Sequence, residues 1–383
     1  MDLDDTPDEA SFRAEVRGWL AAHKPHDLTE LSSVAAIRDL PDVAPALEWS
    51  AKLAEAGYAG ITWPAEHGGR GAPLSYQAIF LEEAAAMDAP VHLGGIGLNM
   101  IGPTIIEYGT PEQKQHLAHI LDGSEIWCQG FSEPGAGSDL AGVRTRATLD
   151  GDHYVINGQK VWSSFAHIAQ WCMLLVRSEA GSERHRGLTM ILVDLDLPGV
   201  EIRPIRELTG DAVFNEVFYN DVRVPVSHVL GAVGDGWNVA MTTLGHERAT
   251  LGFSLVGSLE ALLRRAVALV AEVGVSDPLL LDRLAAEVVE VEALKLTNRR
   301  FLATLEDGAV PGAEGSAIKL RWSLANQRLT SLIFDMLGPA AVAAPEEWRY
   351  QRFRSRANTI EAGTNEVLRG ILAERVLGLP RSR

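Results

Sequence analysis

Apolar residues recur every three to four positions through the first third of the chain. Phe12, Val16, Trp19 and Leu20 would share one face of a helix over residues 8–22. The same period predicts further helices over residues 45–56, 75–88, 90–102 and 111–123. We therefore expect an N-terminal helical domain over residues 1–125.

The period then changes from about 3.6 to two, which is typical of strands. The dipeptides Asp150-Gly151 and Asn157-Gly158 each lie between β-prone runs, and both are predicted to form hairpin turns. The candidate strands are residues 154–156, 161–162, 171–176, 188–193 and 213–219. The pattern predicts a mostly antiparallel β domain over residues 126–233.

From Gly236 onward the helical period returns. Three long helices are predicted at about 255–270, 280–306 and 316–337, and a fourth begins near Asn365. Long helices joined by short loops predict a four-helix bundle over residues 234–383. The expected fold class is therefore α+β and multidomain, with an N-terminal helical domain, a middle antiparallel β domain and a C-terminal four-helix bundle.

A glycine-rich stretch, WCQGFSEPGAGSD, occupies residues 127–139 at the junction of the first two domains. Glycine permits positive φ and close approach of a ligand to the main chain, and Pro134 favours a turn. Ser132 and Ser138 add hydroxyl groups beside backbone N–H groups. The stretch is either a tight surface turn or a small anion-binding concavity.

Composition narrows the class of partner. The 383 residues carry a net charge of −17, which argues against nucleic acid or an anionic membrane as the main partner. The two cysteines, Cys128 and Cys172, have no CxxC spacing, so we expect neither a disulfide framework nor a metal site. The N-terminus is acidic and polar, and no apolar run reaches the ~18 residues of a membrane span. A cytoplasmic protein is expected.

Four segments carry a resemblance to a known family. They are FSEPGAGSD (131–139), INGQKVW (156–162), GHERA (245–249) and AGTNEVLRGILAERVLGLPR (362–381). In order and spacing the chain resembles the acyl-CoA dehydrogenase superfamily over nearly its whole length. The resemblance implies FAD-dependent oxidation of the Cα–Cβ bond of an acyl-CoA thioester, as in β-oxidation, with an electron-transfer flavoprotein as acceptor. An oxidase that passes electrons to O₂ is the alternative within the enzyme class.

The resemblance also implies which residues meet the flavin. The 131–139 loop would contact the ring and the pyrophosphate, the strand after Asn157-Gly158 would wall the isoalloxazine, and the 362–366 turn would reach the ribityl-phosphate portion. The expected cofactor contacts are Phe131, Ser132, Gly137, Ser138, Trp162, Ser164, Thr364 and Glu366. Glu366 departs from the glutamine often found there, and Trp162 could instead fill the core. Ser138 is also expected to contact the substrate.

The catalytic base is not where many family members carry it. That position is Ala362, and Glu361 stands one residue earlier, which on a helix turns a side chain by about 100°. A minority of the family places the base just before an arginine on the first bundle helix, where this chain has Glu247-Arg248. We expect Glu247 to be the base, with Glu361 as second choice, and Arg248 to orient the base or the substrate. The alternative for Glu247 is an ordinary ion pair with Arg248 or a surface charge. The alternative for Glu361 is a solvated or paired loop carboxylate.

Two further departures concern assembly. Residues 271–278 lack the Arg-x-x-Phe-Gly motif, and Asp335 stands where a glutamine would contact the FAD of a neighbouring subunit. The chain thereby resembles an actinobacterial subgroup in which two different dehydrogenase chains form α2β2 heterotetramers that often act on steroid side-chain or other bulky thioesters. We expect the partner chain to supply the missing arginine and glutamine. A non-catalytic or flavin-sharing subunit of such a heteromer is the alternative function.

Overall fold

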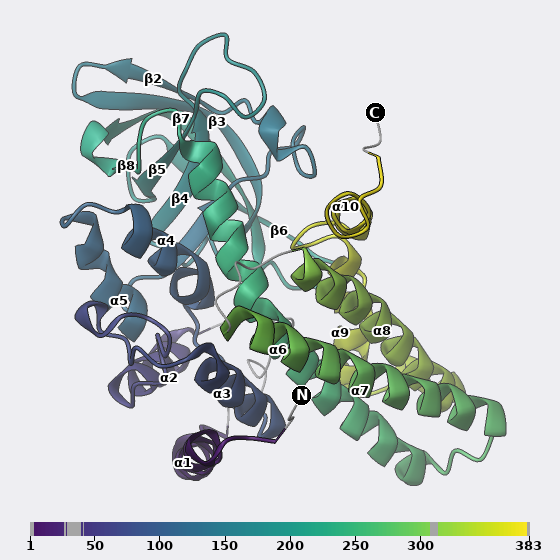
Figure 1. Cartoon of the computed structure of the whole chain (residues 1–383). Helices are drawn as coiled ribbons and strands as arrows, with labels where there is room; N and C mark the ends of the chain where they lie inside the picture. The colour runs from purple at the N-terminus through teal and green to yellow at the C-terminus, as the bar shows by residue number, and fades with distance from the viewer. Residues whose placement is uncertain (1–3, 27, 29–39, 41, 307–312, 381–383) are drawn as a thin grey trace. The chain divides into compact units, whose positions relative to one another are not determined.

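A computed structural model describes residues 4–26, 28, 40, 42–306 and 313–380; the side chains of residues 247–251 and 314 lie outside this description. Figure 1 labels the helices and strands of the chain. The chain divides into two compact units. One unit comprises Met1–Ile37, Ala72–Val91 and Arg248–Arg383, and the other comprises Arg38–Gly71 and His92–Glu247.

The second unit is built on an eight-stranded sheet. Its strands are β1 (Trp127–Gly130), β2 (Arg146–Asp150), β3 (His153–Ser164), β4 (Trp171–Arg177), β5 (Leu188–Asp194), β6 (Val200–Ile205), β7 (Phe214–Pro225) and β8 (Val229–Leu230). They are ordered β6-β7-β3-β2-β4-β5-β8, with β1 beside β4. Only the β1–β4 and β2–β4 pairs are parallel, so the predicted, mostly antiparallel β domain is confirmed.

One of the two predicted hairpin turns is correct. Asp150 pairs with His153 across a two-residue turn, and Gly151 has φ +61°. Asn157-Gly158 is not a turn: it lies inside β3, where the register against β7 shifts between Ile156 and Gly158. A Cβ on Gly158 would lie 2.7 Å from the Cα of Thr145, so glycine is required for close approach of the strands rather than for chain reversal.

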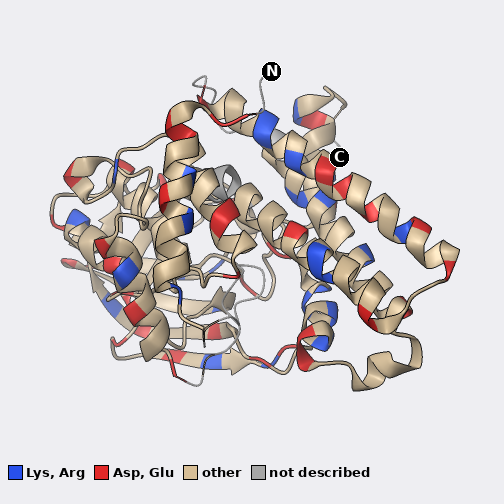
Figure 2. Ribbon diagram, turned by 90° about the horizontal axis from the view of Figure 1, so that it is seen from below, with Lys and Arg blue, Asp and Glu red and all other residues tan. Residues whose placement is uncertain are grey.

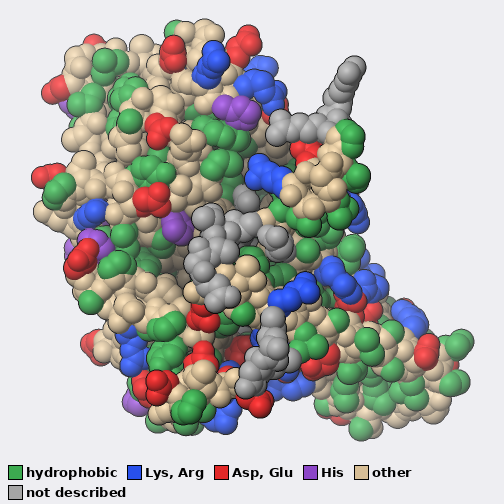
Figure 3. Space-filling view, in the orientation of Figure 1, with side chains coloured by type: hydrophobic (Ala, Val, Ile, Leu, Met, Phe, Trp, Pro, Cys, Tyr) green, Lys and Arg blue, Asp and Glu red, His purple; other side chains and the backbone are tan. Residues whose placement is uncertain are grey.

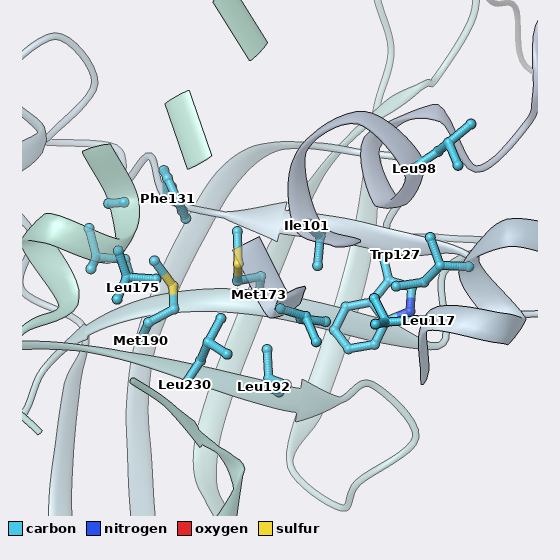
Figure 4. Close-up of a cluster of buried hydrophobic side chains, with 14 of the residues drawn as sticks. Leu98, Ile101, Leu117, Trp127, Phe131, Met173, Leu175, Met190, Leu192 and Leu230 are labelled. Atoms are coloured by element: carbon cyan, nitrogen blue, oxygen red, sulfur yellow. The ribbon is translucent and has the colours of Figure 1, made fainter. Parts of the chain in front are cut away.

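Helices α2 (Ala44–Glu55), α4 (Gly102–Tyr108) and α5 (His116–Asp122) belong to the same unit. Leu98, Ile101 and Leu117 from the helical side pack against Trp127 of β1 and Met173 of β4 in one buried cluster (Figure 4). The predicted helix over 90–102 is instead a π-helical turn at Gly97–Ile101 that leads into α4, and the helix expected from residue 111 is reduced to α5.

The first turns of α6 (Gly236–Val273) are anchored on α4. The hydroxyl groups of Thr104 and Thr243 lie 3.1 Å apart, and those of Tyr108 and Thr242 lie 3.0 Å apart. Val239 and Thr243 are fully buried. This segment, which ends at Glu247, is therefore fixed against the β-containing unit.

The helical unit contains α1 (Pro7–His23), α3 (Leu74–Ala86), the rest of α6, α7 (Pro278–Glu306), α8 (Glu314–Leu337), α9 (Glu346–Arg354) and α10 (Asn365–Ile371). The bundle is confirmed, but its fourth helix is short, since α10 is followed only by a π-helical turn at Leu372–Val376. Helix α9 was not predicted. The turn before α10 has positive φ at Ala362 and Gly363, which prevents continuation of a helix through it.

Ion pairs connect the helices of this unit. Glu83 of α3 is 5% exposed and accepts hydrogen bonds from Arg13 and Arg17 of α1 at 2.9–3.0 Å. Arg328 of α8 binds Glu287 of α7 through two N–H groups. Figure 2 shows acidic and basic residues interspersed along the helices, so complementary charge as well as apolar burial aligns them.

No helix of the described chain is both long and apolar enough to cross a membrane. Both cysteines are buried free thiols, and the described residues contain no cluster of three or more potential metal ligands.

Candidate functional site

The loop after β1 is closed by a tight turn. The N–H of Glu133 donates to the carbonyl of Ala136 at 3.1 Å, and the N–H of Ala136 donates back at 3.0 Å. Pro134 and Gly135 are the two central residues, as the sequence suggested. Phe131, at the start of the loop, is 6% exposed and belongs to the core of Figure 4, so the loop is fixed at its base.

The tip of the loop presents open backbone. A Cβ on Gly135 or Gly137 would meet no atom within 4 Å, and neither glycine has positive φ. Within the described part of the chain, the N–H groups of Ser132, Gly137 and Ser138 meet no acceptor. The backbone conformation therefore does not require glycine at these two positions. Their lack of side chains leaves the main chain accessible to a ligand that accepts hydrogen bonds.

Trp162 is presented by an irregularity of β3. Its φ is +63°, and the β3–β7 register shifts between Lys160 and Ser163. Trp162 is 57% exposed, and its ring forms an edge contact with Phe214 at 6.1 Å between ring centroids. Trp162 is thus not a core residue, and strained backbone that exposes a large aromatic ring is typical of a ligand contact. Ser164 pairs with Phe214 two residues further along the strand.

These two segments are directly joined. The N–H of Val161 donates to the carbonyl of Ser132 at 2.9 Å, next to Trp162 on one side and Glu133 on the other. The buried ammonium of Lys160 donates to the Phe131 carbonyl at 3.0 Å and to the Glu133 carboxylate at 2.9 Å. The sequence reading assigned no role to Lys160, although it lies inside the INGQKVW motif.

The turn before α10 belongs to the helical unit. Thr364 is the N-cap of α10, and its hydroxyl accepts a hydrogen bond from the N–H of Val367 at 3.2 Å. Lys319 of α8 is 6% exposed and donates to the Gly363 carbonyl at 2.7 Å. Glu366 is exposed and lies 3.6 Å from Arg369. The sequence reading did not single out Lys319, because nothing local marks a lysine as buried.

Glu361 is fully engaged in an ion pair. Two N–H groups of Arg354 donate to its two carboxylate oxygens at 3.1 and 2.8 Å, and the amide of Asn358 donates to one of them at 2.7 Å. The Arg354 side chain is only 12% exposed. This geometry favours the structural reading of Glu361 that the sequence left open.

Glu247 and Arg248 lie on α6, four and five residues after the buried Thr243. Their side chains are among those outside the described part of the structure. Gly245, just before them, would meet no atom with an added Cβ, so one face of α6 is open there.

Asp335, which is expected to leave the flavin site of a neighbouring subunit incomplete, also forms an ion pair. The Asp335 carboxylate accepts a hydrogen bond from Arg283 of α7 at 2.8 Å. The side chains of Arg283 and Asp335 are each 50% exposed. Asp335 thus satisfies a contact inside its own bundle.

Three family models match the chain in order: "Acyl-CoA dehydrogenase, N-terminal domain" over residues 6–124, "middle domain" over 128–222 and "C-terminal domain" over 234–377. The order of helices, sheet and helices in the structure agrees with these three domains. The chain belongs to the acyl-CoA dehydrogenase family and is an enzyme of that class.

Particular relatives narrow the comparison. In an alignment 389 positions long, the chain is 45% identical to the acyl-CoA dehydrogenase IpdE1 of Mycobacterium tuberculosis, with 98% of each chain covered. It is 44% identical to IpdE1 of Mycolicibacterium smegmatis, with 97% of each covered. Among solved structures it resembles "Tcur3481-Tcur3483 steroid ACAD" (TM-score 0.89, 32% identity, both chains fully covered) and the ChsE4-ChsE5 complex of Mycobacterium tuberculosis (TM-score 0.86, 31% identity, both fully covered).

Proposed function

We propose that this enzyme is an FAD-dependent acyl-CoA dehydrogenase that introduces a Cα–Cβ double bond into an acyl-CoA thioester. One observation carries the proposal: the N–H groups of Ser132, Gly137 and Ser138, which meet no acceptor among the described residues, lie on a loop that is hydrogen-bonded to the strand bearing the exposed indole of Trp162. A flavin nucleotide needs both features, hydrogen-bond donors for its polar groups and a flat apolar wall for its ring. The residues of the chain therefore fit FAD.

A bound FAD would supply the hydride acceptor for the β-hydrogen of the substrate. The protein's own task is to remove the α-proton and to exclude water while it does so. We assign removal of the α-proton to Glu247, with Arg248 and Ser138 as substrate contacts. Phe131, Ser132, Gly137, Ser138, Trp162, Ser164, Thr364 and Glu366 are the proposed cofactor contacts.

Two features of the 361–362 turn support Glu247 as the base. Ala362, where many family members carry a carboxylate, has none, and the Glu361 carboxylate is bound by Arg354 and Asn358. To act as the base, Glu361 would have to give up three hydrogen bonds, two of them to the mostly buried guanidinium of Arg354.

The test is anaerobic absorbance of the bound flavin during titration with acyl-CoA. Wild type should arrive yellow and bleach with its substrate. We expect Glu247→Gln to keep its flavin but to bleach at least ~10² times more slowly, because a general base typically contributes 10²–10⁴-fold. Glu361→Gln should bleach normally. The reverse pattern would show that Glu361 is the base.

We further propose a bulky, steroid-type acyl group and an electron-transfer flavoprotein as acceptor. The structural relative described as a steroid ACAD supports the first choice. Titration with linear and steroid side-chain thioesters compares the substrates directly. Reoxidation of the reduced enzyme by electron-transfer flavoprotein and by O₂ distinguishes a dehydrogenase from an oxidase.

We also propose assembly with a second, different acyl-CoA dehydrogenase chain. A solved structure that the chain resembles is the ChsE4-ChsE5 complex. In this chain Asp335 stands where the flavin of a neighbouring subunit would need a side-chain amide, and its carboxylate is bound to Arg283. Apolar side chains also gather at the end of the bundle where α6 joins α7 (Figure 3): Val267, Val273, Leu279 and Leu281 are 38–73% exposed. Such a patch is typical of an interface.

Co-expression tests this assembly. We expect the chain to co-purify with a second dehydrogenase chain in equal amounts and to gain flavin by doing so. A stable oligomer of this chain alone with full FAD occupancy would contradict the heteromer. If wild type binds flavin in the complex but no thioester bleaches it, the alternative of a flavin-sharing, non-catalytic subunit is favoured.

A further inference from the structure

A buried ion pair lies directly beneath the proposed flavin site. The Lys160 side chain is fully buried and the Glu133 side chain is 8% exposed. Besides Lys160, the Glu133 carboxylate binds the N–H groups of Arg144 and Thr145 at 2.7 and 2.8 Å. These hydrogen bonds connect the 131–138 loop to β3 through Lys160 and to the segment that precedes β2 through Arg144 and Thr145.

The sheet alone does not explain such a pair. Burying two charges is costly, and replacing a buried pair by apolar or neutral residues of similar volume is often neutral or stabilising. Burial lowers the pKa of the Lys160 ammonium even with Glu133 beside it. The buried Lys160–Glu133 pair thus carries a desolvation cost that packing of the sheet by itself would not require.

The pair also bears on Trp162. Residues 160 and 162 would point to the same side of a regular strand. Here Lys160 is fully buried whereas Trp162 is 57% exposed, because the strand is irregular between Lys160 and Ser163. Holding Lys160 inward at the start of this irregularity fixes the direction in which the indole emerges.

We propose that Lys160 and Glu133 are positioning residues whose buried ion pair preorganises the 131–138 loop and Trp162 as one flavin-binding platform. The inference rests on the proposed function, since it assumes that FAD binds there. The Lys160 ammonium draws the Phe131 carbonyl inward, and the adjacent Val161 N–H holds the Ser132 carbonyl. The carbonyls of Phe131 and Ser132 are thereby occupied, while the N–H groups of Ser132, Gly137 and Ser138 meet no acceptor among the described residues and stay available for the ligand.

The test compares the double variant Lys160→Met/Glu133→Gln with a matched control, Arg223→Met/Asp150→Asn. The control removes an exposed ion pair of 2.7 Å between β7 and β2 of the same sheet. Full-length protein, with its partner chain if one co-purifies, is freed of flavin and titrated with FAD. The affinity for FAD, the fluorescence of the bound flavin at saturation and the unfolding temperature of the apoprotein are measured.

We expect the double variant to unfold within about 4 °C of wild type and to bind FAD about tenfold more weakly, because the platform must be ordered on binding. Bound flavin should fluoresce more strongly, since an indole that is no longer held against the ring quenches it less. The control should match wild type in affinity and fluorescence. Lys160→Met alone should unfold at lower temperature, because it leaves a buried carboxylate without its cation.

Unchanged affinity and fluorescence in the double variant would overturn the inference and leave the pair a purely structural feature. An equal loss in the control would also overturn it, because the effect would then belong to the sheet in general. If wild type itself binds no FAD, with or without a partner chain, the proposed function fails first, and that outcome is seen without any variant.

Discussion

At the scale of single residues, the partners of a side chain decide what it does. Glu361 and Glu366 stand five residues apart near the start of α10, yet the Glu361 carboxylate receives three hydrogen bonds, whereas the Glu366 side chain is 79% exposed and lies 3.6 Å from Arg369. Sequence reasoning could name both but could not rank their environments. The same limit applied to Lys160, whose burial depends on a loop almost thirty residues away.

This difference predicts unequal effects on stability. Glu361→Gln should lower the free energy of unfolding by about 1–3 kcal/mol, because the mostly buried Arg354 loses its charge-assisted hydrogen bonds to the Glu361 carboxylate. Glu366→Gln should change it by less than about 0.5 kcal/mol, since an exposed ion pair at 3.6 Å contributes little. Urea denaturation of the two variants beside wild type measures both. Equal destabilisation would mean that the Arg354 contact is not maintained in solution.

At the scale of elements, the chain shows how one dipeptide signal leads to two structures. Asp150-Gly151 reverses the chain, whereas Asn157-Gly158 continues β3 and disturbs its register. Hairpin turns are specified by local φ and ψ preferences, and these are available from sequence. The contact that makes Gly158 necessary is with Thr145, on the segment before the neighbouring strand β2, so only pairing reveals it.

Alanine substitution separates the two cases. Gly158→Ala should destabilise the protein by about 2–3 kcal/mol, because its Cβ would overlap backbone and side-chain atoms of Thr145 that cannot move freely. Gly151→Ala should cost about 1 kcal/mol, the price of a left-handed residue with open space around it. Thermal unfolding followed by circular dichroism gives both values. A larger loss for Gly151→Ala would contradict the assigned register.

At the scale of the whole molecule, helices that are neighbours in sequence belong to different compact units. Helices α1 and α3 join the bundle helices, with Arg13 and Arg17 bound to Glu83, whereas α2 belongs to the unit that holds the sheet. Periodicity predicted each helix but not its unit, because amphipathicity states which face is buried and not what covers it. The boundaries at residues 125 and 233 remain a prediction from sequence.

Stability of the whole chain should depend on pH through His92. Burial lowers the pKa of this imidazole to about 4, and its Nε2 lies 3.0 Å from the Leu121 carbonyl, which Nε2–H can donate to. As pH falls below about 6.5, the unfolded chain binds a proton that the folded chain refuses, so stability falls towards pH 4. The full effect is on the order of 3 kcal/mol.

Urea midpoints between pH 7 and pH 5 test this, above the range in which Glu83 and Glu133 with their lowered pKa values take up protons. His92→Gln should flatten the decline, because the amide can still donate to Leu121 but does not titrate. His153→Gln, at a more exposed site beside Asp152, serves as the control. A decline that persists in His92→Gln would assign the pH dependence to other groups.

The sequence by itself determined the order of helical and β segments, the 131–139 loop and the family, because periodicity, turn residues and short motifs are local properties of a chain. Tertiary structure decided which residues those motifs bring together. It buried Lys160 under the loop, turned Trp162 outward at an irregular strand and bound Glu361 to Arg354. Each of these outcomes depends on segments that meet only when the chain folds, since burial and pairing are set by neighbours in space.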